Sequence, residues 1–167
     1  MMTGTPAPDE AFADRIYNQI CFACGDANGH GLHMRFERDG ENAVRCVYVP
    51  KPDDQGFPGV MHGGIVAALL DESMAWAMWA WDRALGVTAK METRYRRSAS
   101  LDGPLTVRAR VESVRSRRIE VRAHIEDAQG ATIAESTAVF MRFTPEEEQR
   151  MSAAMGRAPS EAPRPEG

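Results

Sequence analysis

The pattern of apolar and polar positions contains one long apolar segment followed by a series of alternating segments. Residues 61–85 hold no proline and no turn cluster and are rich in Ala, Leu and Met, which predicts a helix. The segment is apolar on nearly all sides, so we expect the helix to be enclosed by the rest of the fold. The Asp71-Glu72 pair at its centre argues against a membrane span.

Alternation of apolar and polar residues follows the helix and predicts an antiparallel meander with short turns. The four expected strands are 88–98, 105–114, 117–127 and 132–143. Before the helix, the alternating runs 32–38 and 42–49 flank Asp39-Gly40, which predicts a hairpin. Residues 50–60 are predicted to be a loop, and residues 9–20 a short amphipathic helix.

The order of these elements predicts an α+β protein of the hotdog type, in which a curled antiparallel sheet wraps around one long central helix. Residues 1–20 form a lead-in with the short helix, residues 21–143 the domain, and residues 144–167 a Pro-rich tail that we expect to be disordered. The sheet leaves an open edge and an open face. We therefore expect a homodimer, or a homotetramer built as a dimer of dimers.

Composition narrows the class of protein. The chain has 167 residues, of which 43% are apolar and 26% charged, as in a single globular domain. Its net charge of −4 argues against a general nucleic-acid binder. Three cysteines make no disulfide framework, and no secretory signal is visible at the N-terminus. These features predict a cytoplasmic protein.

The start of the long helix carries the first candidate site. His62-Gly63-Gly64 precedes the apolar run, and the first turn of a helix has unpaired N–H groups at the positive end of the helix dipole. Glycine there lets a ligand approach the backbone, so Gly63, and less strongly Gly64, could stabilise a developing oxyanion. Alternatively, the glycines only permit a tight entry into the helix.

Asp71 is the second candidate, because an ionised carboxylate is costly to bury among apolar residues. Its helical face also carries small residues, which leave room for a ligand. The alternative is a structural pair with an arginine of the later strands. Eight residues separate Gly63 from Asp71, about 12 Å along a helix, so one carbonyl group cannot touch both. If both act in one reaction, they come from different subunits. Glu72 shares a side with Trp76, and we expect it to meet a cation or an interface.

Two further groups of residues carry weaker signals. The set Cys21, Cys24, His30 and His33 has a loop far shorter than that of a zinc finger, so we expect no metal, and nothing in the chain indicates a cofactor. Most arginines of the later strands are expected on a solvated face. Arg96 and Arg97 could bind the phosphates of a carrier such as coenzyme A.

The sequence PGVMHGGIVAALLDESMAWA resembles the signature of hotdog acyl-CoA thioesterases in the 4-hydroxybenzoyl-CoA thioesterase superfamily, in the subgroup similar to the phenylacetate-pathway (PaaI) protein. In that family an acid follows the histidine of the HGG start by nine residues, as Asp71 follows His62. GVTAKMETRYRRSA and CFACGDANGHGLHMRF resemble further family segments. The resemblance covers roughly residues 20–143.

The resemblance implies hydrolysis of a coenzyme A thioester. Gly63 N–H would polarise the carbonyl, and Asp71 of the partner subunit would act as general base or as nucleophile. Thr88 would orient the water, while His62 would shape the turn. Some relatives have an Asn where this chain has Gly56, so Gln55 is the nearest substitute.

Three alternatives stay open. A non-catalytic acyl-CoA binder would not need the buried Asp71. A hotdog dehydratase would need a catalytic His before Phe57-Pro58-Gly59, where this chain has Gly56. A zinc-dependent binding module is the third.

Overall fold

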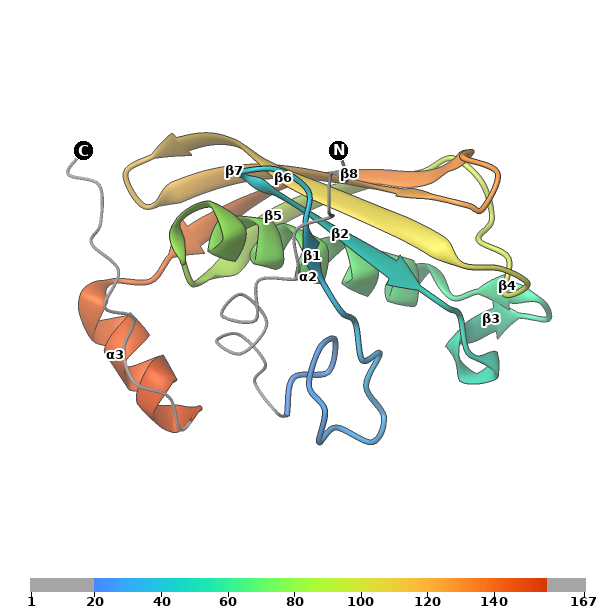
Figure 1. Cartoon of the computed structure of the whole chain (residues 1–167), viewed down its shortest axis with the longest axis horizontal. Coiled ribbons are helices and arrows are strands. Elements are labelled where there is room, and N and C mark those ends of the chain that lie inside the picture. The colour runs from blue at the N-terminus through green and yellow to red at the C-terminus, as the bar shows by residue number, and fades with distance from the viewer. Residues whose placement is uncertain (1–19, 156–167) are drawn as a thin grey trace, which may run out of the picture.

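The computed structural model describes residues 20–155, and its centre is a six-stranded antiparallel sheet packed against one long helix (Figure 1). The strand order in the sheet is β1-β2-β6-β7-β8-β5. The strands are β1 (Glu37–Arg38), β2 (Ala43–Tyr48), β5 (Gly86–Tyr95), β6 (Leu105–Arg115), β7 (Arg118–Glu126) and β8 (Thr132–Arg142). The predicted hotdog architecture, a single sheet on a central helix, is confirmed.

The central helix, α2 (Gly63–Asp82), lies between two layers. The sheet covers one side, and the segment before β1 lies on the other side (Figure 1). Both layers bury apolar side chains of α2, and the ring of Phe36 stacks on Trp76 at a centroid distance of 4.7 Å. This enclosure explains why the helix is apolar nearly all round. The helix ends at Arg83, which takes a left-handed conformation and donates its N–H to Trp79 O.

The predicted hairpin before the helix is only partly correct. The turn at Asp39-Gly40 exists, with Asp39 N–H donating to Ala43 O (2.9 Å). Of the run 32–38, however, only Glu37–Arg38 pairs as a strand. The backbone upstream bonds to the preceding loop instead, with Leu32 N–H donating to Phe22 O (2.8 Å). Its alternating apolar side chains are buried on α2 without strand pairing.

The predicted loop 50–60 contains short ordered elements. They are a 3-10 helix, η1 (Pro52–Asp54), and a two-stranded ribbon of β3 (Gln55–Phe57) and β4 (Val60–Met61). Gly59 turns this ribbon with φ 77°, a conformation that favours glycine. The ribbon leads directly into α2, since β4 ends at Met61 and His62 is the N-cap of the helix. His62 N–H donates to Asp54 O (2.8 Å), which ties the start of the helix to η1.

The prediction that the tail from residue 144 is disordered is wrong for α3 (Pro145–Ala154). Thr144 and Glu147 form a capping box, and Pro145 takes the first position, where a missing N–H costs nothing. The predicted helix at 9–20 lies almost entirely outside the described residues. Within residues 20–155, no helix is both long and apolar enough to cross a bilayer.

Candidate active site

The first turn of α2 leaves one backbone donor unused. His62 is the N-cap, and its Nδ1 accepts from Gly64 N–H (2.9 Å). Ile65 and Val66 donate to His62 O. Among residues 20–155 nothing accepts from Gly63 N–H, and Gly63 is exposed. Gly63 therefore presents an N–H at the positive end of the helix dipole, whereas Gly64 does not.

Tyr95, at the end of β5, closes one side of this turn. Its hydroxyl donates to Gly63 O (2.9 Å), and its side chain is 53% exposed. A Cβ on Gly63 would lie 3.7 Å from Tyr95 Cε1. Nothing in the sequence indicated this contact, because Tyr95 and Gly63 are 32 positions apart in the chain. Tyr95 fixes the position of the Gly63 peptide.

Asp71 and Thr88 meet at the other end of the same strand. Thr88 Oγ1 donates to Asp71 Oδ1 at 2.7 Å, and the Asp71 side chain is half-buried. No basic side chain pairs with Asp71 in the described part of the chain, so the expected alternative of an arginine partner is wrong there. The sequence named both residues, and the structure places them in contact.

These two groups lie along one strand but far apart. β5 contacts Gly63 through Tyr95 and Asp71 through Thr88. The helical rise between Gly63 and Asp71 is about 12 Å. Within one chain, the Tyr95–Gly63 and Thr88–Asp71 contacts therefore hold the Gly63 N–H and the Asp71 carboxylate apart. Both groups lie beside β5, which is an edge strand of the sheet with mostly exposed side chains.

The candidate substrate-binding residues differ in their surroundings. Gln55 is exposed, and its Oε1 accepts from Gly59 N–H (3.2 Å) inside the β3–β4 ribbon. Arg96 forms an ion pair with Glu135 on the exposed surface. Arg97 is exposed and has no carboxylate partner among the residues described. Because both arginines follow Tyr95, they lie near the start of α2.

Gly56 is a departure from the family pattern that has a structural reason. A Cβ at this position would lie 3.2 Å from both Cα and Cδ2 of His62. The larger side chain that some relatives carry there would press on the N-cap of α2. In this chain Gly56 therefore allows the β3–β4 ribbon to pack closely on His62.

Glu72 belongs to a different cluster, on the side of α2 away from the sheet. Ligand atoms of Cys21, Cys24 and Glu72 all lie within 4.8 Å of one another. Trp76 Nε1 donates to Glu72 Oε1 (3.2 Å), as their shared helical side predicted. Within residues 20–155 no basic side chain pairs with Glu72, and its expected place at an interface stays a prediction. The i, i+4 pair with Trp76 was visible in the sequence, but the contact with Cys21 was not.

The pKa values of all three ionisable side chains in this cluster differ strongly from their ordinary values. Burial raises the pKa of Glu72 to about 7, and the nearby Cys21 sulfur adds to this. Hydrogen bonding from Cys24 lowers the pKa of Cys21 to about 5, whereas the same interaction raises the pKa of Cys24. His30 and His33 do not join the cluster.

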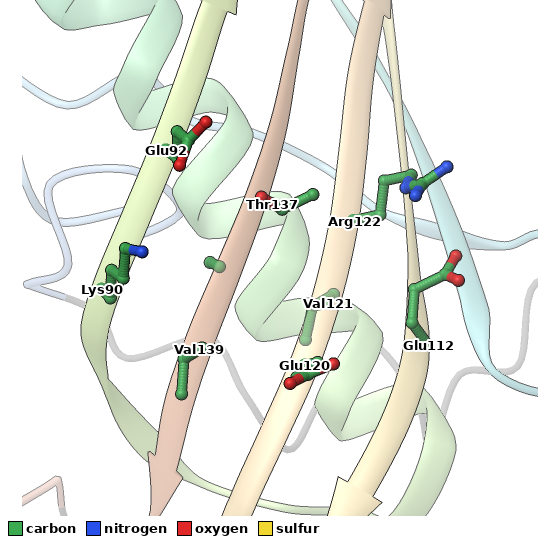
Figure 2. Close-up of a pocket in the computed structure, with 9 residues that line it drawn as sticks. Lys90, Glu92, Glu112, Glu120, Val121, Arg122, Thr137 and Val139 are labelled. Carbon is green, nitrogen blue, oxygen red and sulfur yellow. The ribbon is translucent and has the colours of Figure 1, made fainter.

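A shallow hollow of about 360 Å³ lies on the sheet face opposite α2 (Figure 2). Charged side chains of both signs line it, among them Lys90, Glu92 and Arg122. In Figure 2 the helix ribbon passes behind the strands that carry these side chains. This is the solvated strand face that the sequence predicted. None of the candidate site residues lies in it.

Comparisons with known proteins agree on one family. Residues 58–134 match the family model described as the thioesterase superfamily. Acyl-coenzyme A thioesterase THEM4 of Bos taurus is 22% identical over 135 residues, which are 80% of this chain and 55% of the relative. The chain thus spans about half the length of the curated relatives it matches.

Solved structures share the fold. Protein RHA08564, a thioesterase superfamily protein, is 27% identical with a TM-score of 0.68, over 84% of this chain and 68% of that chain. A hypothetical thioesterase from Streptococcus pneumoniae TIGR4, solved with coenzyme A, is 17% identical with a TM-score of 0.62, over 65% and 87%. PaaI of the E. coli phenylacetic acid degradation operon is 18% identical with a TM-score of 0.63, over 68% and 81%. This chain therefore has the hotdog fold of these proteins, and its residues 58–134 match the thioesterase superfamily model.

Proposed function

We propose that this chain hydrolyses acyl-coenzyme A thioesters to a free acid and coenzyme A. The observation that carries the proposal is the Asp71–Thr88 pair, a half-buried carboxylate held by a hydroxyl at 2.7 Å. The match of residues 58–134 to the thioesterase superfamily model supports it, as do a relative named as an acyl-coenzyme A thioesterase and a neighbour solved with coenzyme A. A protein that only binds acyl-CoA has no need for such a carboxylate.

Each site residue has a defined part in the proposed reaction. Gly63 N–H donates to the thioester oxygen and stabilises the negative charge that develops there. Asp71 takes a proton from water as the water oxygen attacks the carbonyl carbon, or it attacks that carbon directly and forms a mixed anhydride, which water then hydrolyses to the free acid. On either route the C–S bond breaks, and the thiolate leaves with a proton. Thr88, which occupies Asp71 Oδ1, holds the carboxylate in place and orients the water at Oδ2.

The proposed site combines two subunits. Because Gly63 and Asp71 of one chain are about 12 Å apart along α2, the acting Asp71 comes from the partner subunit. Edge strand β5 supports this arrangement, since its outer edge is unpaired and Val87 is 54% exposed. A two-fold axis beside β5 would create two such sites, and two dimers could pair further into a tetramer.

The coenzyme A moiety is proposed to bind near the start of α2. Arg97 has no carboxylate partner in the described region and is free to bind phosphate, whereas Arg96 would have to release Glu135. Gln55 pairs with Met61, the residue before the N-cap His62, and could contact the thioester region. Three free thiols fit the proposed cytoplasmic location.

The test is release of free thiol from short, medium, long and aryl acyl-CoAs by the wild type and Asp71→Asn. Asparagine keeps the shape and can still accept from Thr88, but it carries no charge. We expect turnover to fall on the order of 10²-fold or more. Asp39→Asn, at the exposed β1–β2 turn, is the matched control and should keep wild-type turnover.

Two results would contradict the proposal. Equal turnover by Asp71→Asn and the wild type would remove Asp71 from the mechanism. Saturable binding of acyl-CoA by calorimetry without turnover of any substrate would identify the folded protein as a binder instead.

A further inference from the structure

We propose that Cys21, Cys24 and Glu72 form a binding site for one thiophilic divalent cation such as Zn²⁺. The two cysteines lie in the loop before β1, and Glu72 lies in the middle of α2. Both cysteines fall outside the residues 58–134 matched by the thioesterase superfamily model. The proposed hydrolysis uses none of the three side chains, so the site is a separate feature of this chain.

The spacing of the ligand atoms suits a zinc ion. Zinc bonds sulfur at about 2.3 Å and carboxylate oxygen at about 2.0–2.2 Å, which puts tetrahedral ligand atoms about 3.5–3.8 Å apart. Cys21 Sγ and Glu72 Oε1 are 3.7 Å apart. All three ligand atoms lie within 4.8 Å of one another, so small side-chain rotations would close the set. A fourth position would be left for water.

The loop that carries the thiols is built as a chelating turn. Cys21 and Cys24 have the C-x2-C spacing of structural zinc sites, and Gly25 N–H donates to Cys21 O (2.9 Å) to close the turn. Met34 N–H donates to Ala23 O (2.9 Å), so the loop is fixed against the following segment.

In the described part of the chain, no basic side chain balances the acidic groups of this cluster. Glu72 is largely enclosed, and the structure gives it no basic partner among residues 20–155; its donors are Trp76 Nε1–H and the neighbouring thiols. Two thiols and a carboxylate therefore share protons in a restricted space. A divalent cation that displaces those protons would balance the carboxylate and the thiolates together.

The proposed ligand set differs from the one that the sequence suggested. The expectation of no metal concerned a set that included His30 and His33. His30 is exposed, and His33 takes a positive φ of 55° in the segment that follows the loop. In the proposed site the third ligand is Glu72 and not a histidine. Glu72 lies 51 residues from Cys21 in the chain, and the fold brings the two side chains together.

The test uses the full chain, reduced and stripped of metal with a chelator, and titrated with Co²⁺ as the spectroscopic probe. We expect one Co²⁺ per chain, with thiolate-to-cobalt charge-transfer absorption and the visible bands of tetrahedral cobalt. Cys21→Ser and Cys24→Ser should lose the charge-transfer band. Glu72→Gln, which keeps the side-chain shape, should bind Co²⁺ at least about tenfold more weakly. Zn²⁺ should displace Co²⁺ and raise the Tm of the wild type.

Matched controls separate this site from other thiols and histidines. Cys46→Ala removes a buried thiol outside the cluster, and His30→Ala with His33→Ala removes the histidines of the sequence motif. All should keep the cobalt spectrum. The proposal is overturned if the reduced wild type shows no charge-transfer band. It is also overturned if Glu72→Gln binds as tightly as the wild type, or if the histidine variant loses the metal. Should a serine variant fail to fold, the Glu72→Gln comparison decides.

Discussion

Asp71 and Glu72 are neighbours in the chain, yet their carboxylates have different surroundings. Successive residues of a helix point about 100° apart, so Asp71 lies beside β5 while Glu72 faces the loop of Cys21. Helical periodicity was sufficient to predict that the two differ and that Glu72 neighbours Trp76. The partners Thr88 and Cys21 are separated from the helix by loops, and periodicity carries no information on such contacts. Only the family resemblance pointed to Thr88.

Gly63 offers a matched pair of substitutions that tests its N–H alone. Gly63→Pro deletes the N–H at the first helical position, which tolerates proline, and His62 already has the extended backbone (ψ 133°) that a following proline requires. Gly63→Ala keeps the N–H, and its methyl group would make ordinary contact with Tyr95 at 3.7 Å. We expect kcat to fall about 10²–10³-fold in Gly63→Pro and much less in Gly63→Ala.

The comparison is made by steady-state thiol release on the best acyl-CoA, with circular dichroism to show that α2 is intact. If both variants lose activity equally, crowding at the turn explains the loss and the oxyanion role of the N–H is refuted.

At the scale of elements, predictions from the sequence succeeded where periodicity and burial agree. The helix and the four strands after it appear within a few residues of their expected bounds, because each has a continuous pattern and marked ends. The run 32–38 alternates as a strand does, but its apolar residues pack on α2, and only Glu37–Arg38 reaches β2. α3 was missed because its residues carry little apolar periodicity, and a capping box defines its start.

The junction of β5 and β8 depends on the absence of a side chain at Gly86. A Cβ there would meet the backbone of β8, at 2.9 Å from Met141 C and 3.0 Å from Arg142 Cα. We expect Gly86→Ala to lower the free energy of unfolding by about 1–3 kcal/mol, because backbone atoms cannot rotate away. Urea unfolding measures this change.

Gly103→Ala is the control, since a Cβ at Gly103 meets nothing within 4 Å. It should change the free energy of unfolding by less than about 0.5 kcal/mol. Similar values for the two variants would show that β5 does not approach β8 as closely as described.

At the scale of the whole molecule, the proposed chemistry requires more than one chain. The oxyanion donor and the carboxylate lie at different points along α2, both beside the free edge of β5. Helical geometry applied to the sequence was enough to infer this separation. The position of the partner could not be derived, because residues that meet across an interface have no fixed spacing in one chain. In the described structure, the exposed side chains of β5 mark where the partner would bind.

The most direct test of the account is the activity of a mixed dimer. A chain with Asp71→Asn and a chain with Gly63→Pro are co-expressed with different affinity tags, and the heterodimer is purified on both tags. Each parent homodimer should be nearly inactive, whereas the heterodimer contains one intact site of two and should show about half of the wild-type turnover. A heterodimer no more active than its parents would contradict a site shared between subunits.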